Sequence, residues 1–466
     1  MFGILGIVVS LVLLIALAYR GWNVIIIAPI CAIVGLMFGG LDAPVIATYT
    51  QVFMPALGNY LIKFFPLFLL GAVFGKLMDD SGCARTIAHK IVEWTGKERA
   101  VIAIILACGV LTYGGVSLFV VAFAVFPVAI QMFREGNLPK RLIPAAIALG
   151  SFTFTMSALP GSPAIQNAIP MPYFHTDAFA APGLGLIAGL LMFGCGSAWL
   201  MMRARRARIA GEGYGDDGPF ATAATPSPAP VGDMPSFAVA IIPVVLVLAL
   251  NFVFSKYVIP SLDTDYLALP KYGKTTVSAV AGTWAIILAM LISCAVLIGL
   301  TWKRFANVRQ SLTDGALGSM LPILNVGSEV AYGAVIASLA SFLIIRDWLM
   351  SLTDNPVIGL AIVVNVLAGI TGSASGGMSI ALQAVGQTYL DLAQAANISP
   401  QILHRVAALA SGGLDALPHN GAVITLLAIC GLNHKQSYFD IFMVAVAFPL
   451  MAMIVVIVLD GMFGTF

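Results

Sequence analysis

The sequence predicts an all-α polytopic membrane protein of two inverted repeats with about ten full spans, and three observations lead to that prediction. Of the 466 residues, 60% are hydrophobic and only 9% are charged, with a mean hydropathy of +0.99. Soluble domains carry roughly 25% charged residues. A polar segment divides the chain into two halves of similar length. The triplet Ala-Leu-Pro at 158–160 recurs at 416–418, each time inside a long apolar stretch.

Apolar stretches long enough to cross the hydrocarbon core as helices follow one another in both halves. The N-terminal stretch lacks a basic n-region and an A-x-A cleavage site, so we expect a retained span. In the first repeat, residues 1–202, full spans are expected near 2–19, 22–40, 59–78 and 179–201. In the second repeat, residues 237–466, they are expected near 237–257, 275–301, 317–345 and 438–463.

Residues 203–236 differ in composition from the segments on either side. Four arginines, at 203, 205, 206 and 208, are followed by a stretch of Gly, Asp, Ala and Thr with five prolines. Such a segment has too little apolar surface to form a core. We therefore predict a flexible linker between the repeats.

Three pairs of matching positions indicate an internal repeat. Pro66 matches Pro322, Thr112 matches Thr371, and Pro160 matches Pro418, at separations of 256, 259 and 258 positions. Matched positions that are all separated by nearly the same number of residues are the signature of an internal duplication.

The segments 99–135 and 356–396 predict re-entrant helical hairpins. Residues 99–111 give about 20 Å of helix at 1.5 Å per residue, which is shorter than the ~30 Å hydrocarbon core. Gly- and Ser-rich runs at 112–117 and 372–377 would form the two tips. The alternative is two tilted spans joined by a glycine loop.

The distribution of basic residues predicts the orientation in the membrane. If the N-terminus is outside and each hairpin returns to its own side, each half crosses five times, so the second half is inverted. Both termini would then be periplasmic and the linker 203–236 cytoplasmic. Of the 23 Lys and Arg residues, 17 lie inside under this assignment, as the positive-inside rule requires. The six outside or at outer helix ends are Lys63, Lys256, Lys271, Lys274, Arg346 and Arg405.

The two Ala-Leu-Pro segments predict broken helices over 141–169 and 400–432. Ser162 before Pro163 and Asn420 before Ala422 are expected as N-caps of the restarted helices. Helix N-termini carry about +0.5 charge and attract anions. Hairpin arms beginning at Ser117 and Met378 would add two more such ends. The arrangement predicts a small polyoxygenated anion, most simply a carboxylate, as substrate.

The candidate substrate-binding residues are the small and polar residues at the hairpin tips and helix breaks. For any single one of them, ordinary helix packing is about as good an interpretation. They are Thr112, Gly114, Gly115, Ser117, Gly161, Ser162, Asn167, Thr371, Ser373, Ser375, Gly376, His419, Asn420 and Thr425.

Three ionisable residues inside predicted spans are candidates for proton coupling, because buried charges in membranes are costly and usually functional. They are Glu329, Asp415 and His419, the last of which replaces Gly161 of the first repeat. A Na+ site built from break carbonyls, Asn420 and Asp415 is the alternative. His404 is expected at a membrane interface.

Other function classes lack the motifs they need. The six cysteines are scattered without a C-x-x-C, so no metal site, disulfide framework or cofactor is expected. No H-E-x-x-H or G-x-S-x-G motif occurs, and no second aspartate completes a protease dyad, so an enzyme is not expected. No basic cluster suggests nucleic acid. An anion channel with a continuous pore remains an alternative, as does a receptor.

At these motifs the chain resembles the gluconate permease (GntP) family of bacterial proton-coupled carboxylate symporters. The resemblance covers nearly the whole chain and is strongest at Leu70–Lys76 with Asp79–Gly82, at Ala158–Asn167, and at Asp415–Ala422. The last stretch, with Gly431–Tyr438, resembles the D-β-hydroxybutyrate permease branch and departs from the gluconate permeases.

The resemblance implies H+-coupled import of a short hydroxycarboxylate, such as 3-hydroxybutyrate, across a bacterial inner membrane. Gluconate or another sugar acid, or Na+ coupling, are the alternatives. The wider ion-transporter superfamily implies a homodimer and an elevator mechanism in which a transport domain carries both hairpins.

Overall fold

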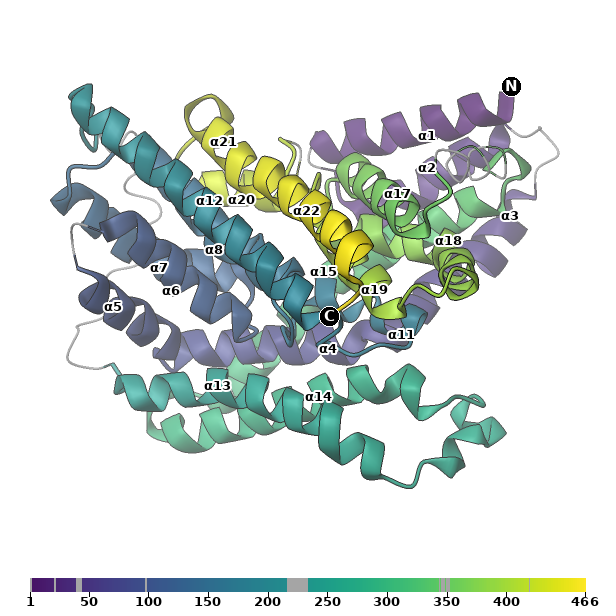
Figure 1. Ribbon diagram of the computed structural model, residues 1–466, viewed down its shortest axis with the longest axis horizontal. Helices are drawn as coiled ribbons and strands as arrows, with labels where there is room; N and C mark the ends of the chain where they lie inside the picture. Colours follow the sequence, from purple (N-terminus) through teal and green to yellow (C-terminus); the bar gives the residue numbers. More distant parts are fainter. Residues whose placement is uncertain are drawn as a thin grey trace.

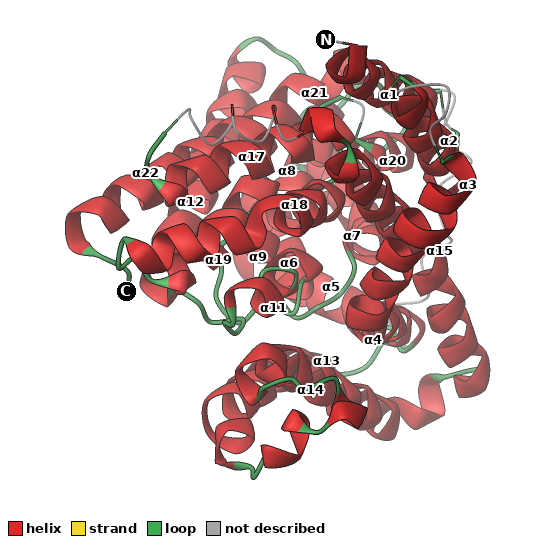
Figure 2. Cartoon of the chain, turned by 90° about the vertical axis from the view of Figure 1, so that its right-hand side faces the viewer, coloured by secondary structure: helices red, strands yellow, loops and turns green. Residues whose placement is uncertain are grey.

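The chain folds entirely into helices and loops in the part that the structure describes. A computed structural model describes residues 2–20, 22–38, 44–96, 99–215, 234–342, 344, 348, 353–418 and 420–466, and none of these is in a strand (Figure 2). Six helices there are long and apolar enough to cross a membrane: Val45–Asp80, Pro182–Ile209, Phe237–Ser261, Val277–Arg304, Val308–Ser338 and His434–Phe463. The all-helical membrane fold is thus confirmed, whereas ten spans and inverted repeats stay predictions.

The described residues of the first half contain twelve α-helices, several of them short. In order these are α1 (Phe2–Tyr19), α2 (Val24–Met37), α3 (Val45–Thr48), α4 (Met54–Asp80), α5 (Cys83–Thr95), α6 (Ala100–Tyr113), α7 (Leu118–Glu135), α8 (Ile143–Ser151), α9 (Phe154–Ser157), α10 (Ile165–Ala168), α11 (Met171–Phe174) and α12 (Pro182–Ile209). A π-helical turn, Tyr49–Phe53, joins α3 to α4, and a 3-10 turn, Lys140–Leu142, precedes α8.

The second half is also helical where the structure describes it. Its described α-helices are α13 (Phe237–Val253), α14 (Val277–Thr301), α15 (Val308–Ser338), α17 (Pro356–Thr371), α18 (Ala374–Ala395), α19 (Pro400–Ser411), α20 (Gly421–Ile429), α21 (His434–Phe442) and α22 (Phe448–Phe463). A π-helical turn, Met443–Ala447, joins α21 to α22.

Two of the long helices begin earlier than the apolar patterns predict. The helix that includes α4 begins at Val45 rather than near 59, and α15 begins at Val308 rather than near 317. At α15 the reason is a cap: the Asn307 side chain accepts a hydrogen bond from the backbone of Gln310 at 3.2 Å. Hydropathy alone does not detect a polar first turn that is held by its cap.

A layer of long helices is built around the contact between α4 and α15. A Cβ on Gly315 of α15 would lie 2.7 Å from the Cα of Val73 on α4, so the glycine allows the two backbones to approach. On either side, α1 and α2 pack at one end of α15, and α14 packs on α4 with α13 beside it (Figure 1).

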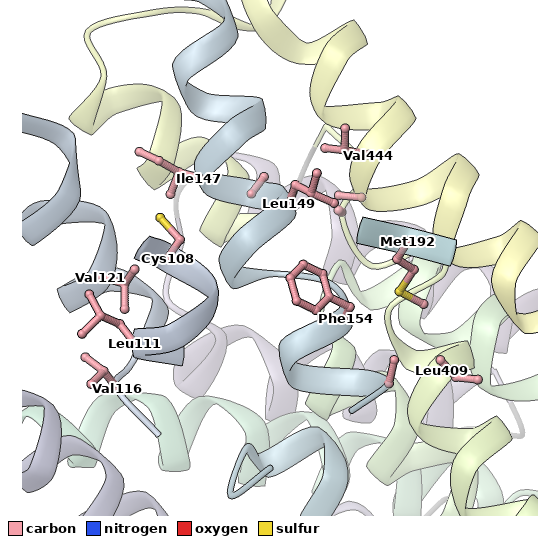
Figure 3. Packing of buried hydrophobic residues seen from close by; sticks show 14 of the residues in the cluster. Cys108, Leu111, Val116, Val121, Ile147, Leu149, Phe154, Met192, Leu409 and Val444 are labelled. Carbon is pink, nitrogen blue, oxygen red and sulfur yellow. The ribbon is translucent and has the colours of Figure 1, made fainter. Parts of the chain in front are cut away.

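The remaining helices form a second group. The α6–α7 pair packs on α8, the α17–α18 pair packs on α19, and α12 runs beside α22 (Figure 1). Figure 3 shows its core, where Cys108 of α6 lies near Ile147 of α8, Leu111 lies further along α6, and Met192 of α12 lies near Leu409 of α19. All five side chains are fully buried.

Helix α12 continues to Ile209, into the segment 203–236 that the sequence predicts as a flexible linker, and a charged cluster at its end ties three elements together. Asp440 of α21 is 1% exposed and accepts hydrogen bonds from Arg203 Nε at 2.8 Å, Trp199 Nε1 at 3.0 Å and Arg141 Nη1 at 3.1 Å. Arg141 also pairs with the more exposed Glu212, at 2.7 Å. Because two cations share this one buried carboxylate, its removal is expected to lower the stability of the fold.

We expect Asp440→Asn to lower the free energy of unfolding by about 3 kcal/mol, because it leaves two half-buried guanidinium groups without their shared counter-charge. Thermal unfolding followed by size-exclusion chromatography measures the change. Glu212→Gln, in the same cluster but at its solvent edge, should have a much smaller effect. Equal effects of the two substitutions would contradict this account of the cluster.

Candidate functional site

The tip of the second hairpin is a helix start with its own cap. Gly372 has a left-handed φ of 62° and ends α17. Ser373 then caps α18, because its hydroxyl accepts a hydrogen bond from the backbone N–H of Gly376 at 3.0 Å. The predicted arm start at Met378 is therefore wrong: the helix begins at Ala374, one turn earlier.

The second helix break lies directly against this tip. The chain leaves α19 at Ser411 and re-enters helix at Gly421. Asn420 caps α20 as predicted, accepting from the backbone N–H of Val423 at 2.8 Å. Its amide nitrogen donates to the carbonyl oxygen of Gly372 at 2.9 Å, so one side chain joins the break to the hairpin tip.

Glu329 reaches the same tip from the middle of α15. It is 7% exposed, and its Oε2 has no hydrogen-bond partner among the described residues. A Cβ on Gly376 would overlap that oxygen, and the Ser373 hydroxyl is within hydrogen-bonding reach of the carboxyl group. The second tip, the second break and one buried carboxyl group therefore meet.

The first hairpin and the first break make an equivalent pair of contacts. The Tyr113 hydroxyl at the end of α6 donates to the carbonyl oxygen of Pro160 at 2.5 Å. Gly115, with a left-handed φ of 93°, packs so closely that a Cβ on it would lie 3.0 Å from Pro163. Asn251 of α13 also donates to the carbonyl oxygen of Gly161, at 3.0 Å.

The prediction that Ser162 caps a restarted helix is wrong. The cap position is Ala164, and the Ser162 hydroxyl accepts from the Ala164 backbone N–H at 3.3 Å across a short turn. The helix that follows, α10, is only four residues long. Pro170 and Pro172 lack the N–H groups that a continuing helix needs. The first break is therefore a buried, irregular segment without the strong dipole of a long helix.

A buried cation from the second half holds this segment in place. Arg405 of α19 is 0% exposed; it donates to the carbonyl oxygen of Ala180 at 2.8 and 3.1 Å and to the Asn167 side chain at 3.2 Å. His404, also fully buried, contacts Asn167 at 3.2 Å and Thr176 at 2.6 Å. The Asn167 amide donates to two backbone carbonyls. Each polar atom of Asn167 thus has a partner.

Sequence reasoning missed these two residues. It placed His404 at a membrane interface and Arg405 at an outer helix end, whereas the structure buries both completely. The signal was their position within an apolar run after Pro400, where an intramembrane charge indicates a structural or functional role.

The two helix breaks also contact each other. A Cβ on Gly412, at the end of α19, would lie 3.4 Å from the hydroxyl of Ser157 at the end of α9. Arg405 donates to the Ser157 carbonyl at 3.4 Å. The hairpins also exchange contacts with the opposite halves: α7 packs on α20, and α18 packs on α10 and α11.

The other candidate residues are distributed over the two groups. The Thr112 hydroxyl is buried without a hydrogen-bond partner among the described residues. Thr425 donates to the Gly421 carbonyl at 2.8 Å, inside α20. Asp415 is half-buried in the open segment of the second break. His419 lies outside the described residues. Gly114 and Ser117 lie at the first tip with Gly115, and Thr371 and Ser375 at the second tip with Ser373.

Comparison with known proteins gives matches along almost the whole chain. The family model "GntP family permease" matches residues 2–461. The "Uncharacterized transporter YxjC" of Bacillus subtilis (strain 168) is 44% identical over 449 residues, which is 94% of each chain. The "High-affinity gluconate transporter" of Escherichia coli (strain K12) is 29% identical over 163 residues, covering 34% of this chain and 35% of that one.

Two solved transporter structures share the fold at low sequence identity. The Alcanivorax borkumensis YdaH transporter superposes with a TM-score of 0.56 at 16% identity, over 91% of this chain and 90% of that one. Neisseria gonorrhoeae MtrF, described as illuminating a class of antimetabolite efflux pumps, gives a TM-score of 0.55 at 13% identity, over 90% and 85%.

Proposed function

Because this chain belongs to the GntP family of permeases, and is therefore a membrane transporter and not an enzyme, we propose that it imports a small hydroxycarboxylate together with protons. The observation that supports this most is the meeting of Ser373, Asn420 and Glu329 at one point. Two capped helix starts and a buried carboxyl group are suited to hold an anion and a proton.

The two helix starts favour a carboxylate. The helix α18 has 22 residues and α20 has nine, and the Asn420 cap of α20 is linked by a 2.9 Å bond to Gly372, the residue before the Ser373 cap of α18. Helix N-termini bind anions through unpaired N–H groups and the helix dipole. The resemblance of Asp415–Ala422 to the D-β-hydroxybutyrate permease branch favours a short hydroxy-monocarboxylate such as 3-hydroxybutyrate over gluconate, the substrate in the name of one relative.

The coupling ion in this proposal is the proton, carried by Glu329, Asp415 or His419. Glu329 has no paired cation among the described residues, and a carboxyl group in such a place exchanges a proton more readily than it holds a charge. Na+ held by break carbonyls, Asn420 and Asp415 is the competing proposal, since oxygen ligands suit that ion.

We further propose that the two halves are inverted repeats working as an elevator. Matching contacts support this: α6 packs on α8 as α17 packs on α19, and the second arm of each hairpin, α7 or α18, packs on the opposite broken helix. The layer around α4 and α15 would be the scaffold of a homodimer in a bacterial inner membrane. The hairpins and broken helices would move, with both termini periplasmic and residues 203–236 cytoplasmic.

Uptake into proteoliposomes tests the transport proposal. Labelled 3-hydroxybutyrate, gluconate, lactate and citrate are each offered with and without an inward proton gradient. We expect 3-hydroxybutyrate to accumulate, and to do so only with the gradient. Uptake that depends on Na+ and ignores the proton gradient would overturn proton coupling; conductance without accumulation would indicate a channel.

We expect His419→Ala to abolish uptake while the protein remains folded and monodisperse, because in the sequence a titratable histidine stands where the first repeat has Gly161. His89→Ala, on the amphipathic helix α5, is the matched control and should transport normally. Unchanged uptake by His419→Ala would remove this residue from the site.

A further inference from the structure

The Glu329 carboxyl group of α15 contacts the first turn of the long helix α18, and one of its oxygens can still accept a hydrogen bond. It is 7% exposed, and Oε2 lacks a hydrogen-bond partner among the described residues. That oxygen lies so close to Gly376 that a Cβ there would overlap it, and the Ser373 cap is within hydrogen-bonding reach. A buried side chain of α15 thus reaches the start of α18, an element on the other side of the interface between the two helix groups.

Among the described residues, no ion pair gives Glu329 a counter-charge. Tyr60 of α4, 3% exposed, is a titratable neighbour of Glu329 and also interacts with Ser379 of α18. Other titratable or charged groups on the packed elements have contacts of their own: Lys63 lies over the Tyr173 ring, Cys31 lies beside Tyr332, Tyr49 stacks on Phe53, Lys76 pairs with Asp80, Tyr389 lies against Gly359 and Asp391 bonds to Gln387.

Among the described residues, the start of α18 is therefore the positive feature that this carboxyl group contacts. The N-terminus of a helix carries about half a positive charge over its first turn. The proposed function assigns the same helix start to the substrate carboxylate. Two anions at one water-poor position repel each other strongly, since screening by water is weak there.

We propose that the Glu329 carboxylate is an internal ligand of the α18 N-terminus, and that the substrate carboxylate replaces it only when Glu329 is protonated. This deepens the proposed function and rests on it. As the substrate anion binds, Glu329 takes one proton from the water on the entry side and becomes a neutral carboxylic acid. When α18 has carried the substrate to the other side, Glu329 of the α4–α15 layer releases its proton there, and the carboxylate binds α18 again once the empty helix returns.

Among the described residues, the first half shows no such carboxyl ligand. The residue that matches Glu329 there is Val73, which packs against Gly315 of α15. Gly75 of α4 lies near the start of α7, where a Cβ on it would lie 3.5 Å from the backbone nitrogen of Ser117. With one such ligand in the described part of the chain, the proposal assigns one proton to each substrate anion.

Binding of labelled 3-hydroxybutyrate to the purified full chain between pH 5.5 and 8.5 tests this. The substrate stays ionised over this range. We expect the wild-type Kd to rise by up to about tenfold per pH unit on the alkaline side, as linkage to one proton requires. Glu329→Gln should bind with a Kd that changes less than about threefold over the whole range. Asp314→Asn, which removes another α15 carboxylate, should keep the wild-type slope.

The outcomes separate the two proposals. A wild-type pH slope in Glu329→Gln, or a flat profile in the wild type, overturns the internal-ligand inference and leaves transport standing. A wild type that binds none of the four carboxylates at any pH overturns the proposed function, and this inference with it. Should Glu329→Gln fail to fold, an indicator dye in weakly buffered wild-type protein still decides: about one proton taken up per substrate bound supports the inference, and none overturns it.

Discussion

Replacing Arg405 with methionine should leave little folded protein. The substitution removes the hydrogen bonds that Arg405 makes to the carbonyl oxygens of Ala180 and Ser157 and to the Asn167 side chain. All of these surround a fully buried guanidinium group. Each buried acceptor left unpaired costs about 1–3 kcal/mol, so we expect a loss of about 3 kcal/mol or more. Size-exclusion chromatography and thermal unfolding in detergent measure it.

Two further variants make the Arg405 result interpretable. Arg208→Met, at the exposed end of α12, removes the same charge from the chain and should leave stability unchanged. Arg405→Lys keeps the charge but cannot reach three acceptors from one nitrogen with the geometry of a guanidinium group, so an intermediate stability is expected. Wild-type stability of Arg405→Met would show that the first break does not depend on this side chain.

Gly377→Ala should abolish transport. Gly377 faces α17 so closely that a Cβ would overlap the backbone of Ala368 and Leu367. Backbone atoms cannot rotate away as a side chain can, so the hairpin arms must separate. Overpacking of this kind costs about 1–3 kcal/mol. The separation would also move Ser373 away from Glu329 and Asn420. Uptake of 3-hydroxybutyrate and the unfolding temperature measure both effects.

The matched control for this substitution lies on α15. A Cβ on Gly318 meets nothing within 4 Å, and alanine is favoured over glycine within helices by about 1 kcal/mol. Gly318→Ala should therefore transport normally and be slightly more stable. Normal uptake by Gly377→Ala would contradict the close packing of the hairpin and its role at the site.

The sequence was most informative where a local rule decides the structure. Asn420 could be predicted as a cap because an amide before a restarting apolar run has one usual role, and the structure confirms it. Ser162 satisfied the same rule and failed, since Pro170 and Pro172 end the following helix after one turn. Non-local contacts were beyond reach: no pattern in the sequence places Arg405 against Ala180, 225 positions away.

In the candidate site, too, local features could be predicted from the sequence and non-local contacts could not. Glu329 could be singled out as a charge within a span, but its position against Gly376 follows from the packing of α15 on α18. The sequence placed substrate-binding residues at both breaks. The structure gives the second break and tip the capped helix starts, and it makes the first break a buried segment held by Arg405.

Proton movement during substrate entry tests the central claim most directly. Wild-type protein is reconstituted into liposomes that contain a pH-sensitive dye, with no ion gradients imposed, and 3-hydroxybutyrate is added outside. Protein-free liposomes and Gly377→Ala give the passive rate. We predict that the lumen acidifies faster than the passive rate, in step with uptake of labelled substrate. Uptake without acidification, or uptake that requires Na+, would contradict the account.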